Sequence, residues 1–281
     1  MMRAARRWAA AGAAAALLIE GALAGCSAHG AATAPDGAAH AAPLKPGVSA
    51  LTLPGGRTAT VHVPSHLAGP APLVLVLHEI AGNGAVAAGY GFDPLVDADG
   101  FVAVYPDGID GSWNAGGCCG DASDNGTDDV AFLTSVVKQV EARTAIDPKR
   151  VYATGFSNGA MMAYRLACET SLFAAIAPMS GDVVTDCTHP VPASVLHVHG
   201  MDDTDVVDRV GIDNPWRTAD GCAPPTVAQS GQVHTSTAEC ADGRVVELVT
   251  IDGMSHQVST AVNGYDAAAR IWAFFEAHPG A

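Results

Sequence analysis

The sequence predicts an α/β fold built on a mostly parallel sheet flanked by helices. Continuous apolar runs of strand length recur along the chain, and segments with helical periodicity separate them. Strands that alternate with helices in this way pair in parallel within one sheet. With 281 residues, 49% of them hydrophobic, the chain can bury a sizeable core. Because no repeat or change in composition divides residues 48–281, we expect one domain there.

The elements are expected in the following order. Residues 50–64 predict two strands around a turn at Pro54-Gly55-Gly56. Apolar runs then predict buried strands at 72–78, 100–106, 150–155, 173–180 and 193–200, and a further strand is expected within 245–253. Helical periodicity predicts helices at 128–144, 159–168 and 265–278. The acidic residues that open the first of these helices favour the positive end of its dipole.

The N-terminal residues 1–26 predict a signal peptide. Three arginines precede an apolar stretch, residues 8–18, that is too short to span a bilayer comfortably. The segment ends in Leu23-Ala24-Gly25-Cys26, which resembles the lipobox of bacterial lipoproteins, whose cysteine is lipidated after cleavage. An ordinary signal peptide cleaved at a small residue is the alternative. Residues 27–47, rich in Ala, Pro, Gly and His, predict a flexible linker. We therefore expect a protein that is secreted, or anchored through Cys26 to the outer face of the cell membrane.

The remaining six cysteines and the net charge limit the environment and the partners. An even number of cysteines in an exported chain predicts disulfides, with Cys222–Cys240 and Cys168–Cys187 as the favoured local pairs. Cys118 and Cys119 either pair with each other or stay reduced. The formal charge of −15 repels phosphate backbones, so we expect no nucleic-acid partner. We expect a monomer.

A candidate nucleophile lies in Gly155-Phe156-Ser157-Asn158-Gly159, which matches the pattern G-x-S-x-G. The motif closes a predicted strand and opens a predicted helix, as a nucleophile elbow requires. Its glycines permit a cramped backbone, and the free N–H groups at the helix start point toward a developing negative charge. A serine hydroxyl still needs a base to become a nucleophile.

The acid and the base are expected after two later strands, in the chain order Ser, acid, His. Asp202, Asp203 and Asp205 follow the strand at 193–200, and His256 follows the strand expected within 245–253. Both loops lie just past the C-terminal ends of strands, where open α/β sheets place their ligands.

Seven segments together resemble one family. They are LVLHEIAGNG, SWNAGGCCG, DDVAFL, DPKRVYATGFSNGAMMAYRLAC, FAAIAPMSG, HVHGMDD and DGMSH, in this order between Pro72 and His278. They are similar to the polyhydroxybutyrate-depolymerase-like esterases, including lipoprotein esterases related to feruloyl and acetylxylan esterases. The resemblance implies an α/β-hydrolase fold and a serine esterase in which Ser157 is the nucleophile, Asp203 the acid and His256 the base. From the residues alone, Asp202 and Asp205 stay open as the acid.

The oxyanion hole is expected to use the backbone N–H groups of Asn158 and Ile80. Glu79 departs from the family, whose histidine here is usually followed by glycine, and it brings a carboxylate near the oxyanion. The Trp-Pro pair that often follows the family's catalytic histidine is replaced by Gln257-Val258. Glu79 and Trp113 are therefore the candidate substrate contacts, although Trp113 could equally be a core tryptophan under a loop.

Two patterns suggest metal ligands but fit other structures better. Residues 121–129 match the first part of a calcium loop, yet Phe132 stands where the closing carboxylate is required. His197 and His199 occupy alternate positions of one strand, which is typical of ordinary packing. We expect neither a metal nor a cofactor.

The predicted function is the hydrolysis of carboxylic esters by a Ser-His-Asp acyl-enzyme mechanism. Polyhydroxyalkanoate or another polyester, and feruloyl or acetyl esters, are the candidate substrates. The alternative is a non-catalytic surface lipoprotein that uses the fold as a binding module.

Overall fold

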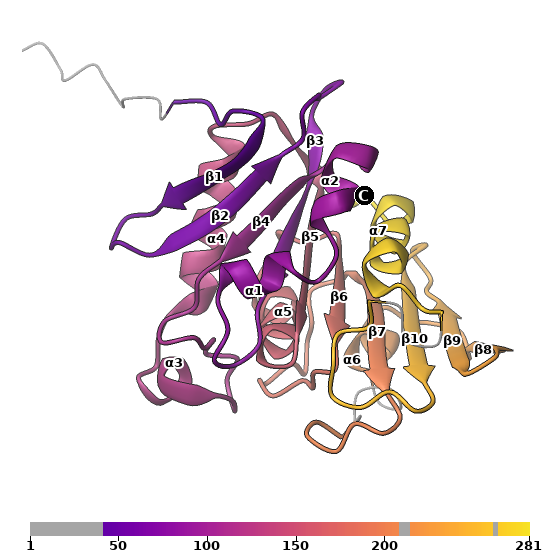
Figure 1. The fold of residues 1–281 in the computed structure, drawn as a ribbon. Helices are drawn as coiled ribbons and strands as arrows, with labels where there is room; N and C mark the ends of the chain where they lie inside the picture. Colours follow the sequence, from indigo (N-terminus) through magenta and orange to yellow (C-terminus); the bar gives the residue numbers. More distant parts are fainter. Residues whose placement is uncertain (1–41, 208–213, 261–263) are drawn as a thin grey trace, which may run out of the picture. The chain divides into compact units, whose positions relative to one another are not determined.

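The computed structural model describes residues 42–207, 214–260 and 264–281. They form a ten-stranded sheet in the order β1-β2-β4-β3-β5-β6-β7-β10-β9-β8 (Figure 1). Its strands are β1 (Gly47–Thr52), β2 (Thr58–Val63), β3 (Ala71–Leu77), β4 (Val102–Pro106), β5 (Ile146–Phe156), β6 (Ala175–Met179), β7 (Ser194–Gly200), β8 (Thr226–Ser230), β9 (Val233–Glu239) and β10 (Val245–Ile251). The predicted strands are all present.

The centre of the sheet is parallel and both ends are antiparallel. Strands β4, β3, β5, β6, β7 and β10 pair in parallel with their neighbours in that order. At one end β1 and β2 form the predicted hairpin. At the other end β9 and β8 add an antiparallel hairpin that the sequence did not indicate. Strand β8 is exposed throughout and contains no apolar run, which explains why the pattern missed it.

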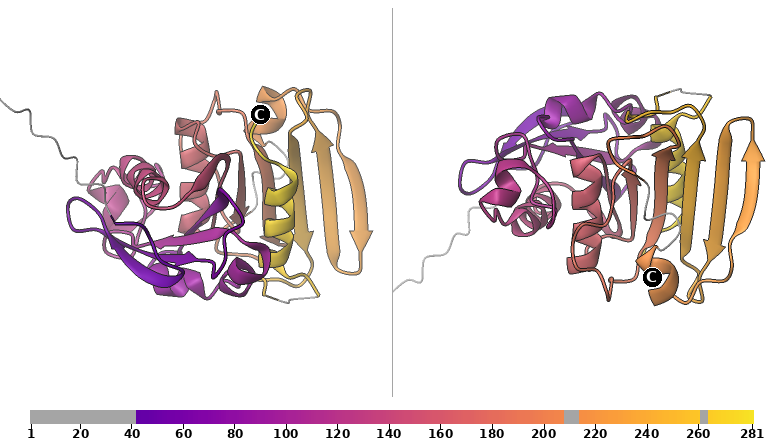
Figure 2. Two further views of the ribbon diagram at one scale, coloured as in Figure 1. Left: turned by 90° about the horizontal axis from the view of Figure 1, so that it is seen from above. Right: turned by 90° about the horizontal axis from the view of Figure 1, so that it is seen from below.

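Helices cover both faces of the sheet (Figure 2). They are α1 (Gly84–Ala88), α2 (Asp93–Asp99), α3 (Gly120–Asp124), α4 (Asp129–Glu141), α5 (Asn158–Glu169), α6 (Pro215–Ala219) and α7 (Ala267–Ala277). Side chains along β3 alternate between two cores, as the period of a strand requires. Leu75 packs with α4 and α5, whereas Val74 and Val76 pack with α2 and α7. The three predicted helices are confirmed as α4, α5 and α7, and the others are too short to show periodicity.

Several predictions concern the N-terminal part of the chain. The signal peptide at 1–26, Cys26 and residues 27–41 of the predicted linker lie outside the described residues. The last linker residues already contact the domain, because the Leu44 N–H donates to the Arg143 carbonyl at 2.9 Å and β1 begins at Gly47. No helix in the described part of the chain combines the length and apolarity needed to cross a bilayer.

Three disulfides are formed. Cys222 is bonded to Cys240 and Cys168 to Cys187, as predicted from their spacing. Cys118 is bonded to the adjacent Cys119, which settles the alternative left by the sequence.

Candidate active site

Ser157 lies at a sharp turn between β5 and α5. Its backbone has φ 53° and ψ −118°, a conformation that L residues rarely adopt and that persists only where the surroundings enforce it. A Cβ added to Gly155 would lie 2.7 Å from the Leu77 carbonyl oxygen, and one added to Gly159 would lie 2.5 Å from the His78 carbonyl oxygen. The two glycines thus let the turn pack directly against the end of β3.

The structure brings Ser157, His256 and Asp203 together from three separate loops. His256 Nε2 lies 2.9 Å from Ser157 Oγ, and His256 Nδ1 lies 2.8 Å from Asp203 Oδ2. A carboxylate only accepts hydrogen bonds, so Nδ1 carries the proton and Nε2 of the neutral ring can accept from the serine hydroxyl. The ring also packs against Phe156, with 4.7 Å between centroids.

Asp203 is held as a buried carboxylate. Its Oδ1 accepts the backbone N–H groups of Asp205 at 3.0 Å and Val206 at 2.9 Å, and His199 Nε2 lies 3.4 Å from its Oδ2. Burial raises the pKa of the Asp203 carboxyl, but the Val206 amide and His256 outweigh that effect and hold its pKa below the usual value. Asp203 is therefore charged at neutral pH, where it can orient His256.

The neighbouring acids occupy different places. Asp202 and Asp205 are exposed, and Asp205 contributes its amide to Asp203. Among the described residues, the carboxylate hydrogen-bonded to His256 is that of Asp203.

In the loop after β3, the groups on either side of Ile80 are engaged in hydrogen bonds. His78 Nδ1–H donates to the Glu79 carbonyl at 2.7 Å, and His78 Nε2 accepts the Gly108 N–H at 2.9 Å. The N–H groups of Ala81 and Gly82 donate to the carbonyls of Gly111 and Glu79. Neither the Ile80 N–H nor the Asn158 N–H donates to another group in the described part of the chain. Both are thus available to an added oxygen.

Burial lowers the pKa of His78, so its ring stays neutral in this arrangement. The sequence carries no signal for the role of His78, because a histidine at the end of a strand resembles any other strand residue. The hydrogen-bond partner of its Nε2, the Gly108 amide, lies thirty residues later in the chain.

Glu79 is held by Tyr90. The Tyr90 hydroxyl donates to Glu79 Oε2 and accepts the Glu79 N–H at 3.2 Å. Burial and the hydrogen bond to Glu79 raise the pKa of Tyr90, so the hydroxyl keeps its proton. The Glu79 carboxylate, which the sequence places near the oxyanion, is therefore hydrogen-bonded to the Tyr90 side chain.

Trp113 corrects one expectation. Its side chain is fully buried in the core, where its ring lies 4.7 Å from the His78 ring and 6.5 Å from the Phe132 ring. Its indole N–H donates to the His78 carbonyl at 2.9 Å. The prediction that Trp113 faces the substrate is wrong, and the alternative of a core tryptophan under a loop holds.

The two candidate metal patterns form hydrogen-bonded structures instead. His197 Nε2 lies 3.0 Å from His199 Nδ1, and His199 Nε2 lies 2.7 Å from the Val206 carbonyl. In the segment that partly matches a calcium loop, Asp129 forms an ion pair with Arg57. Among the described residues, no three His, Cys, Asp or Glu side chains are grouped in a way that could hold a metal ion.

Comparison with known proteins identifies relatives of the chain. The sequence model of the family described as "Esterase PHB depolymerase" matches residues 58–262. Feruloyl esterase B of Piromyces equi is 28% identical over 242 residues, which cover 75% of this chain but only 44% of that protein. A probable feruloyl esterase C of Aspergillus flavus is 30% identical over 224 residues, covering 74% of this chain and 78% of the relative.

Solved structures show the same fold. An acetyl xylan esterase from Aspergillus awamori superposes with a TM-score of 0.65 at 18% identity, covering 82% of this chain and 99% of that chain. An S-formylglutathione hydrolase from Staphylococcus aureus gives a TM-score of 0.56 at 12% identity, with 84% and 99% covered. The fold is that of the α/β hydrolases.

Proposed function

Since the chain belongs to the PHB depolymerase esterase family and is a carboxylic ester hydrolase, we propose that it acts through a covalent acyl-enzyme on Ser157. The observation that carries the proposal is the His256 ring, which is hydrogen-bonded to both Ser157 and Asp203. A hydroxyl, an imidazole and a buried carboxylate in this order form the arrangement that activates a serine.

In the first half of the reaction, Ser157 Oγ attacks the ester carbonyl carbon and its proton passes to His256 Nε2. Asp203 stabilises the imidazolium that results. The oxyanion accepts hydrogen bonds from the N–H groups of Ile80 and Asn158. As the intermediate collapses, the ester C–O bond breaks and the leaving alcohol takes the proton from His256.

In the second half, water replaces the alcohol. His256 removes a proton from the water as it attacks the acyl carbon, and it then returns that proton to Ser157 Oγ as the acid leaves. The reaction consumes one water and needs no further reactant.

The proposed substrates are feruloyl or acetyl esters of plant polysaccharide. Relatives named as feruloyl esterases and a bifunctional acetylxylan esterase/xylanase of Neocallimastix patriciarum support this class. The Trp-Pro pair that often follows the catalytic histidine is replaced by Gln257-Val258, which favours these esters over an insoluble polyester.

Export of the chain is part of the same proposal. Three disulfides suit an oxidising compartment outside the cytoplasm. Secretion, or attachment through a lipid at Cys26, would place the enzyme where plant polymers are found.

Parallel hydrolysis assays test the function. Methyl ferulate, acetylated xylan, p-nitrophenyl acetate and a polyester film are incubated with the wild type and with His256→Ala. We expect hydrolysis of the first three by the wild type and loss of at least about 10³-fold in His256→Ala. Full activity of His256→Ala on p-nitrophenyl acetate would contradict the assigned base, and hydrolysis of the film alone would overturn the substrate class.

Glu79→Gln tests whether the carboxylate next to the oxyanion hole obstructs the reaction. Glutamine still accepts the Tyr90 hydroxyl hydrogen bond but carries no charge near the developing oxyanion. We expect kcat on p-nitrophenyl acetate to stay the same or to rise by up to about fivefold, because a nearby negative charge disfavours an oxyanion. Tyr90→Phe is the companion variant, because it leaves the charge but removes the hydroxyl, and its kcat should fall. A tenfold loss in Glu79→Gln would instead give the carboxylate a direct role.

A further inference from the structure

The two N–H groups proposed to bind the oxyanion come from segments far apart in the sequence. Ile80 lies in the loop after β3, and Asn158 opens α5. Two donors bind one oxygen well only when their separation is fixed before the reaction. A residue that contacts both segments could fix this separation.

Trp113 contacts both of them. Its backbone N–H donates to Asn158 Oδ1 at 2.8 Å, and its carbonyl accepts from Asn158 Nδ2 at 3.0 Å. The Asn158 side chain thus clamps the Trp113 backbone with two hydrogen bonds. On the other side, the indole Nε1–H donates to the His78 carbonyl at 2.9 Å, two residues before Ile80. One residue therefore links the start of α5 to the loop after β3.

The loop that carries Trp113 is itself fixed by a contact to Asp129. Asp129 Oδ2 accepts the Asn114 N–H at 2.7 Å, and the Asn114 side chain donates to the Thr127 carbonyl at 2.9 Å. Asp129 is fully buried at the first turn of α4, where the helix dipole favours its charge.

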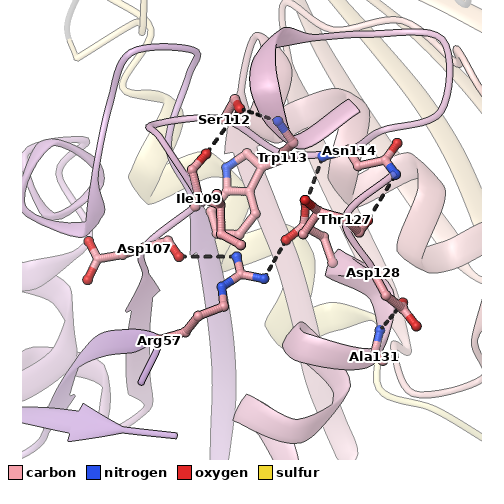
Figure 3. Close-up of polar contacts among 12 residues, drawn as sticks. Arg57, Asp107, Ile109, Ser112, Trp113, Asn114, Thr127, Asp128 and Ala131 are labelled. Atoms are coloured by element: carbon pink, nitrogen blue, oxygen red, sulfur yellow. Dashed lines mark hydrogen bonds and ion pairs between the residues drawn. The ribbon is translucent and has the colours of Figure 1, made fainter. Parts of the chain in front are cut away.

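Arg57 balances the Asp129 charge and packs on the aromatic side chains of this region. Its Nη1 lies 2.7 Å from Asp129 Oδ1, and its guanidinium lies 3.4 Å from the Phe132 ring centroid and 5.8 Å from the Trp113 ring centroid. Arg57 Nη2 also donates to the Asp107 carbonyl at 3.2 Å (Figure 3). Trp113 is thus held in one place by neighbours on both sides.

We propose that Trp113 is a positioning residue that sets the separation of the Ile80 and Asn158 N–H groups. The proposal rests on the proposed esterase mechanism and adds a residue that does not touch the substrate. Because the oxyanion exists only in the transition state and the intermediates, a displaced donor should lower kcat and leave substrate binding unchanged.

Trp113→Phe is the informative variant, because it keeps an aromatic ring and removes the N–H that holds His78. The matched control is Trp216→Phe. Trp216 is also fully buried, and its indole N–H also donates to a backbone carbonyl, that of Val191 at 2.9 Å. The two substitutions make the same chemical change in the core, but the hydrogen bonds of Trp216 go to Asn214 and Val191, and its ring packs on Tyr164, six residues beyond Asn158 in α5.

We expect Trp113→Phe to lower kcat for p-nitrophenyl acetate by about ten- to a hundredfold, with KM within about twofold. Trp216→Phe should keep the wild-type kcat despite a similar decrease in the melting temperature. An alkylboronic acid, which forms a tetrahedral adduct with the serine, should bind Trp113→Phe more weakly by about the factor lost in kcat/KM. Its affinity for Trp216→Phe should equal that for the wild type.

Asn158→Ala provides a second approach, because it keeps the backbone N–H and removes the clamp on Trp113. We expect a loss in kcat of the same order. The loss in the double variant should be smaller than the product of the single losses, because the two contacts, Asn158 with the Trp113 backbone and the indole with His78, both act through the position of Trp113. If Trp113→Phe does not fold, Asn158→Ala decides the matter by the same comparison of kcat and KM.

Equal kcat values for Trp113→Phe and Trp216→Phe would overturn the proposal and show that Trp113 only packs the core. Unchanged kcat in Asn158→Ala would do the same. A failure of the mechanism itself looks different, since the wild type would then hydrolyse no ester or Ser157→Ala would stay active.

Discussion

Asp203→Asn is expected to lower kcat by about 10⁴-fold while the fold stays intact. The Oδ1 atom of Asp203 accepts two backbone N–H groups, so the carbonyl oxygen of an asparagine would take that position. Its NH₂ group would then face His256 Nδ1, 2.8 Å away in the wild type. A donor at this place makes Nδ1 the hydrogen-bond acceptor and leaves the ring proton on Nε2. A protonated Nε2 cannot accept the proton of the Ser157 hydroxyl.

Asp205→Asn and Asp202→Asn are the matched controls. Both aspartates lie within two residues of Asp203, and both are exposed. Asp205 contributes its backbone N–H, which the substitution retains. We expect kcat within about twofold of the wild type for each, measured on p-nitrophenyl acetate. A loss of 10³-fold or more in either control, with activity retained in Asp203→Asn, would assign the acid to the other aspartate.

Gly159→Ala should have the second largest effect. A Cβ at this position would lie 2.5 Å from the His78 carbonyl oxygen and would also overlap the Leu77 carbonyl, both of which are backbone groups. Neither can move without shifting the end of β3 and the loop that carries Ile80. We expect a loss of about 3 kcal/mol or more in the free energy of unfolding and a loss of at least about 10²-fold in kcat.

Gly69→Ala serves as the control for this substitution. Gly69 precedes β3, and an added Cβ would meet no atom within 4 Å. Its melting temperature and kcat should match those of the wild type to within small errors. If Gly159→Ala melted like Gly69→Ala and kept its activity, the tight packing of the elbow against β3 would not be required.

The parts of the fold that the sequence predicted are those with a strong local pattern. Strand β3 reads as an unbroken apolar run because both of its faces are buried, Leu75 in one core and Val74 in the other. The helix α5 was predicted from the small and apolar residues that follow Ser157. The hairpin of β8 and β9 has no apolar pattern, because β8 is exposed throughout and β9 is polar and largely half-buried. Pairing of β9 with β10 and with β8, and not burial, determines its structure.

The sequence predicted those residues of the proposed site whose positions follow from a motif at the end of a strand. Ser157 and His256 were selected from their places after strands, whereas only the family resemblance distinguished Asp203 from Asp202 and Asp205. The structure brings the side chains of Ser157, His256 and Asp203 together. The orientation of side chains was less accessible. From the sequence, Trp113 stays open as a substrate contact or a core tryptophan, because the group that its indole N–H contacts, the His78 carbonyl, lies 35 residues earlier in the chain.

The environment of Glu79 shows the same limit. A carboxylate beside an oxyanion hole suggested an electrostatic conflict, yet Tyr90 takes up that carboxylate from the segment after α1. No local pattern links the two residues, because their contact depends on the turn that follows α1. The electrostatic environment of the site therefore depends on tertiary contacts such as the one between Tyr90 and Glu79.

The central claim is that Ser157 is the nucleophile, and covalent labelling tests it most directly. The wild type and Ser157→Ala are treated with a fluorophosphonate, and the labelled peptide is located by mass spectrometry. The account predicts one adduct per chain, on Ser157, with full loss of esterase activity on labelling, and neither adduct nor activity in Ser157→Ala. An active wild type that forms no adduct, an adduct on another residue, or an active Ser157→Ala would contradict it.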